Sequence, residues 1–309
     1  MIKRLLIASA ITIALFKSGI FVFATPVPAL FLFVKYGRKE GFSALATLML
    51  IALAAFLTGY VGRFEFLYFC YYGLIGLFLG EGFVRKFDIF RLSGVAILST
   101  LAVMGIFFLL LYSDSYGNII QGIRTFVVQG MDEAISLQSG VAALTPQQLA
   151  YLTAEKASIA DFMLKVMPSA LVVFSLLVVS VTLLLTNAMT KKSGGLKYLG
   201  NVAMKELPFW PVWSVIVCGM AFLADSYVVH NEYLRFVAIN GLFCCSGFFF
   251  IQGCFVVTFW MQRFKSPFLR LAVYGLIFAF MQFMGLVLIA LGLSDNWVGF
   301  RKKVVNKIA

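Results

Sequence analysis

Long apolar runs of about 20 residues follow one another along most of this 309-residue chain. A helix of about 20 residues crosses the hydrocarbon core of a bilayer, and these runs are continuous rather than alternating as in the strands of a membrane barrel. The pattern therefore predicts an all-α integral membrane protein with about eight transmembrane helices. The predicted helices cover residues 5–24, 41–60, 64–84, 92–112, 166–186, 212–227, 234–260 and 268–291.

The first run is joined to a shorter apolar piece by the sequence Thr-Pro-Val-Pro at positions 25–28. Two prolines remove backbone donors and oppose a straight helix, so we predict a helix broken near Pro26 and Pro28. Residues 5–34 then form either one bent helix or a span followed by a short half-helix. Broken backbone at membrane depth is tolerated only where protein or a water-filled cavity covers it.

One polar stretch, residues 113–165, interrupts the apolar pattern. Apolar residues at helical spacing between positions 119 and 135 predict an amphipathic helix. A second helix is predicted to begin at residues 145–148, where threonine, proline and glutamine occupy the cap, first-turn and capping-box positions. The chain is thus expected to have three parts. They are an N-terminal four-helix half (1–112), a helical insertion near one membrane face (113–165) and a C-terminal four-helix half with a basic tail (166–309).

Composition agrees with a membrane location. The chain is 62% hydrophobic and 12% charged, with a mean hydropathy of +0.98, whereas a soluble domain carries roughly 25% charged residues. The formal net charge is +12, but lysine and arginine gather in short loops between apolar runs. This placement indicates topology signals and anionic lipid headgroups rather than nucleic acid. We expect a multi-pass protein of the cell inner (cytoplasmic) membrane whose partner is the lipid bilayer.

The basic loops do not fix the side of the termini. With eight spans, the clusters near residues 35–39, 85–91, 191–205 and 263–270 all fall on one side, which the positive-inside rule makes cytoplasmic. Both basic termini would then lie outside, against the rule. A return pass after Pro28 moves the N-terminus inside but leaves the C-terminal tail unexplained.

No sequence motif supports catalysis. The chain has no GxxxxGK[ST] loop, no GxSxG elbow and no HExxH pair. Its five cysteines lack metal-ligand spacing, and there is one histidine. We expect no enzyme activity, no metal and no cofactor, and the energy for any transport would come from elsewhere.

Lys17 is the strongest pointer to a functional site, because it lies near the middle of the first apolar run. A charge at the bilayer centre costs at least about 2.5 kcal/mol, and no acidic partner stands out within the spans. Lys17 therefore either faces an anionic ligand, or its stem snorkels or its ammonium binds carbonyls freed by the proline break. Three intramembrane amides either bond neighbouring helices or line a small-molecule cavity with Lys17. They are Asn240, Gln252 and Gln282.

Small residues recur four positions apart on two of the predicted helices. Such faces let helices approach closely, either within the chain or with a separate membrane partner. The two faces consist of Ala10, Ala14 and Ser18 in the first helix, and Gly76 and Gly80 in the third.

Several stretches together resemble a known family. They are PVP at 26–28 with the basic turn KYGRKEG at 35–41, PSAL at 168–171, QGCFVVTFW at 252–260, SPFLR at 266–270 and LGLSDNWVGFR at 291–301. The set resembles the YybS-like family of bacterial polytopic membrane proteins, which has no agreed activity, so the resemblance implies no catalytic residue.

The N-terminal half is also distantly similar to the substrate-binding membrane subunits of energy-coupling-factor vitamin transporters. That similarity implies solute binding, a separate ATPase module and a coupling partner on the face formed by Ala10, Ala14 and Ser18. We therefore interpret the chain as an integral membrane protein that binds or helps transport a small solute without its own ATPase. The alternative is a non-transporting membrane scaffold or assembly factor.

Overall fold

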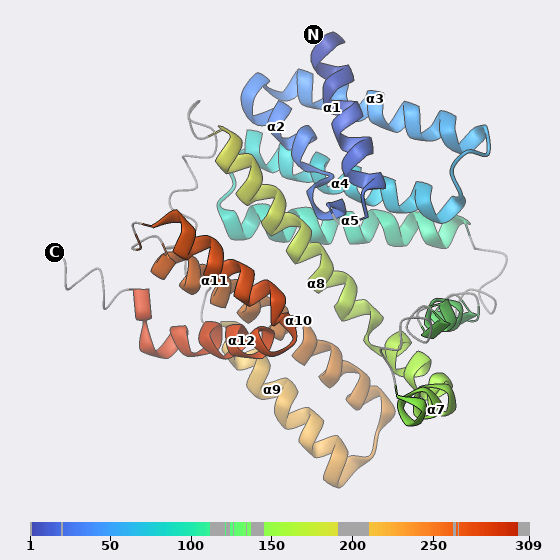
Figure 1. Ribbon diagram of the computed structural model, residues 1–309, viewed down its shortest axis with the longest axis vertical. Coiled ribbons are helices and arrows are strands. Elements are labelled where there is room, and N and C mark those ends of the chain that lie inside the picture. Colours follow the sequence, from blue (N-terminus) through green and yellow to red (C-terminus); the bar gives the residue numbers. More distant parts are fainter. Residues whose placement is uncertain are drawn as a thin grey trace. The chain divides into compact units, whose positions relative to one another are not determined.

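The computed structural model describes residues 2–301 except 20, 112–120, 122–123, 126, 134, 137–144, 191–209, 262–263 and 265. The described part of the chain is built from helices and contains no β-strand (Figure 1). This confirms the all-α membrane fold. The predicted basic cluster at 191–205, the tail after Arg301 and part of the predicted amphipathic helix lie outside the described residues.

Six helices in the described part are long and apolar enough to cross a membrane. They are α3 (Arg38–Leu57), α4 (Arg63–Val84), α5 (Ile89–Leu111), α8 (Lys156–Thr190), α9 (Trp210–Ala224, continued by the π-helical turn η6 at Asp225–Val229) and α10 (Glu232–Met261). A further pair, α11 (Pro267–Ala279) and α12 (Met281–Val298), is bent by 105° and makes seven spans only if it counts as one. The sequence predicted about eight.

The first predicted span is not a single straight helix. Helix α1 (Ile2–Lys17) ends at Lys17, and Gly19 follows with a φ of +69°, a left-handed conformation that favours glycine. The short 3₁₀ helix η1 (Val22–Ala24) and helix α2 (Val27–Tyr36) then carry the chain back. The break near Pro26 and Pro28 is confirmed, and it belongs to a helical hairpin.

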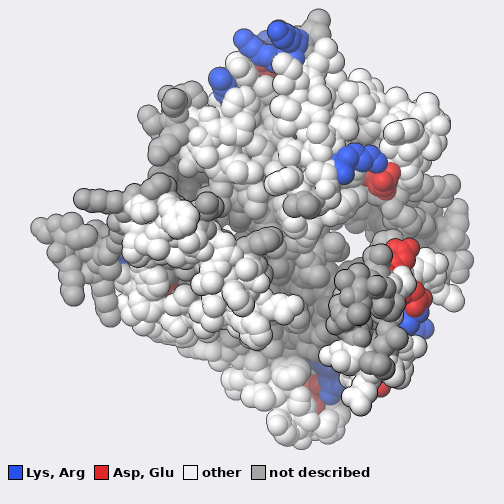
Figure 2. All heavy atoms as spheres, viewed as in Figure 1, with Lys and Arg blue, Asp and Glu red and all other residues white. Residues whose placement is uncertain are grey.

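Contacts at the open end of this hairpin show that the chain returns. The Nη1 atom of Arg4 lies 3.7 Å from Oε1 of Glu40, and its guanidinium lies 4.3 Å from the ring centre of Tyr36. The start of α1, the end of α2 and the start of α3 therefore meet. Figure 2 shows the cations gathered at this end.

The closed end of the hairpin lies at the other end of α4. Lys17 pairs with Glu65 near the start of α4, whereas Arg38 pairs with Glu81 near its end. Because a helix rises 1.5 Å per residue, the two glutamates are about 24 Å apart along α4. Lys17 is therefore separated from the basic end of the hairpin by most of the thickness of a bilayer.

Contacts divide the chain into two units that do not follow its linear order. Unit 1 comprises Met1–Gly105, Val172–Val212 and Cys245–Ala309, and unit 2 comprises Ile106–Leu171 and Trp213–Cys244. The predicted boundary of the insertion at residue 165 falls within α8, which continues unbroken from Lys156 to Thr190.

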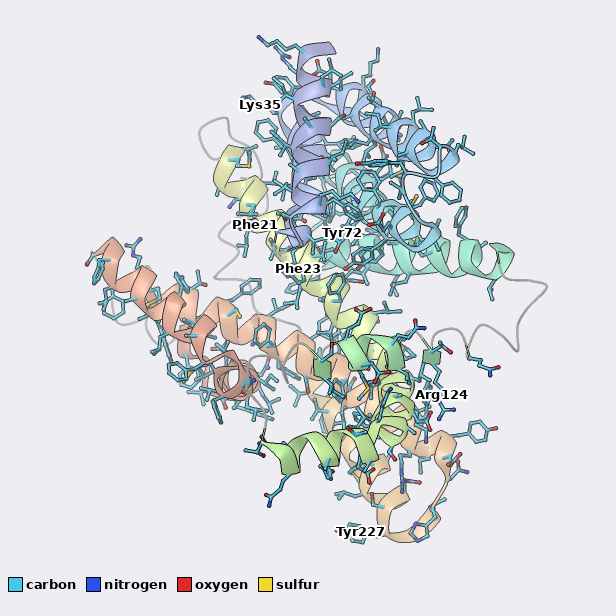
Figure 3. All side chains as sticks on the ribbon, turned by 45° about the vertical axis from the view of Figure 1, so that its right-hand side comes forward. Phe21, Phe23, Lys35, Tyr72, Arg124 and Tyr227 are labelled. Atoms are coloured by element: carbon cyan, nitrogen blue, oxygen red, sulfur yellow. The ribbon has the colours of Figure 1, made fainter. Side chains whose placement is uncertain are left out.

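The core of unit 1 is formed by α2, α4, α5 and α8. Buried aliphatic residues from these helices pack together, and the hydroxyls of Tyr71 and Ser175 hydrogen-bond at 2.7 Å between α4 and α8. Aromatic side chains extend this core, with the rings of Phe23 and Phe174 5.2 Å apart and Phe16 6.2 Å from Tyr72 (Figure 3).

Unit 2 holds the described part of the insertion. Helix α7 (Pro146–Ala154) begins with the predicted capping box, because Thr145 accepts from the backbone of Gln148 and the Gln148 side chain accepts from the backbone of Thr145. The ion pairs Arg124–Asp161 and Lys156–Asp132 join the segments around these residues.

The last described residues of the chain lie beside the end of α10. The ring of Phe300 packs 5.8 Å from that of Trp260, one residue before α10 ends at Met261. If α11 and α12 enter the membrane and return, the chain has six crossings between Arg38 and Met261, and both termini lie on the basic side. This arrangement removes the conflict between the basic tails and the positive-inside rule.

We therefore predict that reporters fused to either terminus will both be active on the cytoplasmic side. A reporter inserted after Tyr227, in the turn between α9 and α10, should be active on the outer side. Paired alkaline phosphatase and fluorescent protein fusions would measure this. A C-terminus outside with the N-terminus inside would show instead that α11 and α12 form a seventh span.

Candidate functional site

Lys17 has an acidic partner. Its Nζ lies 3.2 Å from Oε1 of Glu65, and the two side chains are 49% and 51% exposed. The expectation that no acid within the spans pairs with Lys17 was wrong, because Glu65 lies at the start of the predicted span 64–84. The two residues are 48 positions apart, so sequence proximity gave no signal.

The position of Lys17 also differs from the prediction. It is the last residue of α1 rather than the middle of a span, so its charge favourably meets the negative end of the helix dipole. Exposed ion pairs contribute about 0–1 kcal/mol. A ligand role for Lys17 stays a prediction, but Glu65 already balances its charge.

The side-chain amide of Asn240, in α10, hydrogen-bonds to the backbone of α8 beside Pro168. Its Oδ1 accepts from the backbone N–H of Ser169 at 3.0 Å, and its Nδ2 donates to the carbonyl of Lys165 at 2.8 Å and to that of Phe236 at 2.9 Å. Ser169 and Lys165 are the i and i−4 positions of α8 on either side of Pro168, which has no N–H to donate. The amide therefore binds α10 to α8 where α8 is weakest, within unit 2.

Gln252 belongs to a buried cluster of polar side chains in unit 1. Its Nε2 donates to Oδ2 of Asp295 at 3.2 Å, and the same oxygen accepts from Nε of Arg301 at 3.0 Å and from its Nη2. The other carboxylate oxygen accepts from the backbone N–H of Phe300 at 3.0 Å. The side chains of Arg301 and Asp295 are 1% and 0% exposed.

A close crossing of α10 and α12 places this cluster. A Cβ on Gly253 would lie 2.0 Å from the carbonyl oxygen of Leu288, and one on Gly292 would lie 1.9 Å from that of Phe249. Two backbones in direct contact leave no room for side chains at the crossing. Gln252 and Asp295, each next to this contact, therefore meet across a short gap.

Gln282 does not join this group. It was predicted to face the bundle interior, but it is exposed, one residue after α12 begins at the bend that follows α11. Within unit 1, the described contacts of Lys17 and Gln252 are with Glu65 and Asp295, respectively. Asn240 belongs to unit 2. The ligand-binding role of these residues stays a prediction.

Sequence reasoning missed Asp295 and Arg301. Arg301 was assigned to a basic tail and Asp295 to no role, although both lie in the stretch LGLSDNWVGFR. The available signal was an acid and a base six positions apart around Gly299, whose φ of +59° turns the chain back after α12. A left-handed glycine after a helix allows the following side chain to reach the helix end.

The two small-residue faces have different surroundings. Gly76 and Gly80 are buried against α2, where a Cβ on Gly76 would lie 3.3 Å from that of Ala29 and one on Gly80 would overlap the Phe33 ring. Ala10, Ala14 and Ser18 are exposed, because α1 turns its opposite side, with Leu5, Ala8 and Thr12, towards the core.

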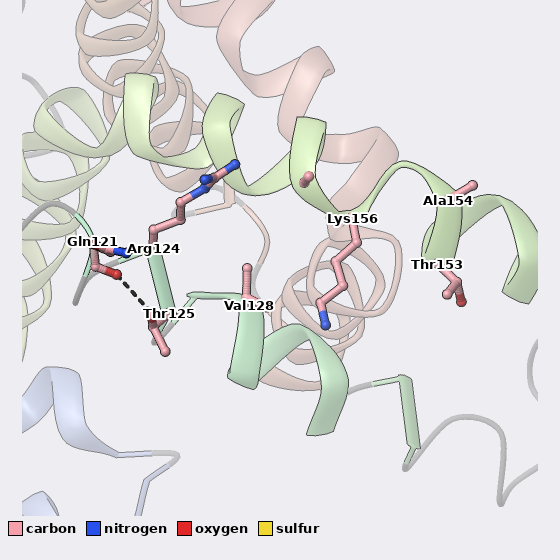
Figure 4. A pocket seen from close by; sticks show the side chains of 8 residues that line it. Gln121, Arg124, Thr125, Val128, Thr153, Ala154 and Lys156 are labelled. Carbon is pink, nitrogen blue, oxygen red and sulfur yellow. Dashed lines mark hydrogen bonds between the residues drawn. The ribbon is translucent and has the colours of Figure 1, made fainter.

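Unit 2 contains a cleft of about 490 Å³ (Figure 4). Arg124 and Lys156 line it, together with Gln121, Thr125 and Thr153. Both cations are held by the ion pairs to Asp161 and Asp132. Among the described residues, no group of histidine, cysteine, aspartate or glutamate side chains is arranged to bind a metal ion.

Comparison with known proteins places the chain in a family. Residues 3–296 match the DUF2232 family, whose description is predicted membrane protein. The chain belongs to the DUF2232 family. Comparison with curated proteins and with solved structures gave no match. The family therefore establishes a membrane protein, and the YybS-like and energy-coupling-factor resemblances stay predictions.

We predict that the two ion pairs of this DUF2232 protein differ sharply in their effect on stability. Arg301→Met leaves the buried Asp295 carboxylate unpaired and should cost about 3–5 kcal/mol, whereas Lys17→Met should cost about 0–1 kcal/mol. Thermal unfolding of the purified variants in detergent, followed by size-exclusion chromatography, would measure the difference. Equal melting temperatures for the two variants would show that the buried ion pair stabilises the fold no more than the exposed one.

The helix crossing gives a second comparison. Gly292→Ala should destabilise this DUF2232 protein strongly, because its Cβ would overlap the backbone of α10. Gly285→Ala on the same helix, where nothing lies within 4 Å, should be neutral or stabilising by up to about 1 kcal/mol. Melting temperatures of the two variants, measured side by side, test this. If Gly292→Ala were as stable as Gly285→Ala, the two helices would not cross in contact there.

Proposed function

We propose that this DUF2232 protein is a non-transporting membrane scaffold or assembly factor that docks a second integral membrane protein against α1. One observation carries the proposal. Ala10, Ala14 and Ser18 form an exposed small-residue face, whereas the comparable face of Gly76 and Gly80 is filled by α2. The same pattern therefore already mediates close helix contact within this chain.

The physical basis is helix packing in lipid. Lipid tails are as apolar as leucine, so helices associate in membranes through close backbone approach and van der Waals contact rather than through the hydrophobic effect. Larger exposed side chains, Leu6, Ile7 and Ile11, lie on the same exposed side of α1 and would add apolar contact with a partner helix.

The polar residues predicted to bind a solute support the scaffold over transport. Lys17 is paired with Glu65, and both donors of the Asn240 amide are used by backbone carbonyls. Neither needs a ligand to balance its charge or hydrogen bonds. Their contacts are those expected of residues that hold helices together.

Solute binding is the second candidate function, and the cleft of unit 2 favours it. Its volume of about 490 Å³ falls within the range of about 300–1,000 Å³ for small-molecule sites. Arg124 and Lys156 would supply the positive charge for an anionic solute, in competition with Asp161 and Asp132. Transport would still need a separate ATPase partner.

We predict that a photo-activated crosslinker at position 14 will give one discrete adduct with another membrane protein in native membranes. Ala10→Leu should remove this adduct, because a larger side chain on the same face holds the partner helix away. Mass spectrometry of the adduct identifies the partner and distinguishes it from a second copy of this chain.

Position 102 provides the matched control, since Ala102 is also an exposed alanine on a helix of unit 1. A crosslinker there should label only lipid, and Ala102→Leu should leave the adduct from position 14 unchanged. Lipid labelling alone at both positions, or an adduct insensitive to Ala10→Leu, would contradict docking on α1.

A further inference from the structure

The basic end of unit 1 has more basic than acidic residues (Figure 2). This end is formed by the start of α1, the end of α2, the start of α3, the end of α4 and the start of α5. The acidic residues of these segments are Glu40, Glu81 and Asp88. The basic residues are Lys3, Arg4, Lys35, Arg38, Lys39, Arg85, Lys86 and Arg91.

Two of these cations are held on one aromatic ring. The guanidinium carbon of Arg4 lies 4.3 Å from the ring centre of Tyr36, and Nζ of Lys35 lies 5.4 Å from the same centre and 5.2 Å from that of Phe31. A cation within about 6 Å of a ring is attracted by the negative face of the π-system. The two charges therefore lie at most about 10 Å apart, and both belong to flexible side chains that can close on one anion.

Acidic residues neutralise Arg4 and Lys35 less than they neutralise the neighbouring Arg38. Arg38 makes a two-pronged contact with Glu81, at 2.7 and 3.1 Å. In contrast, Arg4 reaches Glu40 only at 3.7 Å, and no ion pair is formed by Lys35 within the described part of the chain. The Arg4 side chain is 52% exposed, and Lys35 is exposed (Figure 3).

We infer that Arg4, Lys35 and Tyr36 bind the phosphate diester of an anionic phospholipid. The guanidinium and the ammonium supply charge-assisted donors, and the tyrosine hydroxyl supplies a third. The site lies where the helices end, at the level of the headgroups. Beside it, the partly buried ring of Phe31 offers apolar surface to an acyl chain, which a soluble phosphate would not use.

Native mass spectrometry of the full chain, released from nanodiscs that contain phosphatidylglycerol and phosphatidylcholine, tests this inference. Wild-type protein should retain phosphatidylglycerol in preference to phosphatidylcholine, and added inorganic phosphate should not displace it. Arg4→Gln and Lys35→Gln should each lower the retained fraction about tenfold, because each loses a charge-assisted hydrogen bond to the phosphate diester. Tyr36→Leu removes the ring and should lower the retained fraction of phosphatidylglycerol although all charges are kept. If this variant fails to fold, Tyr36→Phe replaces it, because Tyr36→Phe keeps the ring and removes only the third donor, and it should also lower the retained fraction.

Lys39→Gln is the matched control, because it removes one exposed charge from the same end of unit 1 without touching the Tyr36 ring contacts. It should retain phosphatidylglycerol as the wild type does. An equal loss in Lys39→Gln would reduce the site to diffuse attraction and overturn the inference. Equal retention of phosphatidylcholine, or displacement by inorganic phosphate, would also overturn it.

Discussion

A bilayer offers no hydrogen bonds and does not solvate charge, so each polar group in the membrane must find a partner in the protein or reach the headgroups. The α1–α2 hairpin satisfies this constraint at its closed end. Ser18 Oγ donates to the carbonyl of Leu15 and accepts from the N–H of Phe21, and Thr25 donates to the carbonyl of Val22. The carbonyls of Leu15 and Val22 and the N–H of Phe21 are thereby bonded, and Lys17 lies at an exposed helix end.

The same constraint explains the polar residues deeper in the chain. Asn240 supplies donors and an acceptor around Pro168, where an α-helix loses a backbone bond. Asp295 is neutralised by Arg301 and bonded by Gln252 where α10 and α12 touch. These contacts join helices at defined positions.

Hydrophobic run lengths predicted the all-α class and most spans, and the threonine, proline and glutamine at residues 145–148 predicted the α7 capping box, because these features depend on local pattern. The run lengths misplaced Lys17, since the turn depends on the backbone conformation of Gly19 rather than on apolarity. Pairings such as Lys17–Glu65 and Gln252–Asp295 join residues more than 40 positions apart and follow from packing alone. Gln282 was misjudged because the bend before α12 has no proline or charge to mark it.

The central claim is that residues 2–36 form a hairpin whose closed end reaches the membrane surface opposite the basic end. Labelling of Phe21→Cys, at an exposed position of the turn outside the small-residue face, with a membrane-impermeant maleimide tests it most directly, in a variant whose five native cysteines are replaced by alanine or serine. The account predicts rapid labelling from the outer side of sealed cells, with Ser9→Cys, which is buried halfway along α1, unlabelled. Protection of Phe21→Cys from both sides of the membrane would place the closed end within the bilayer and contradict the account.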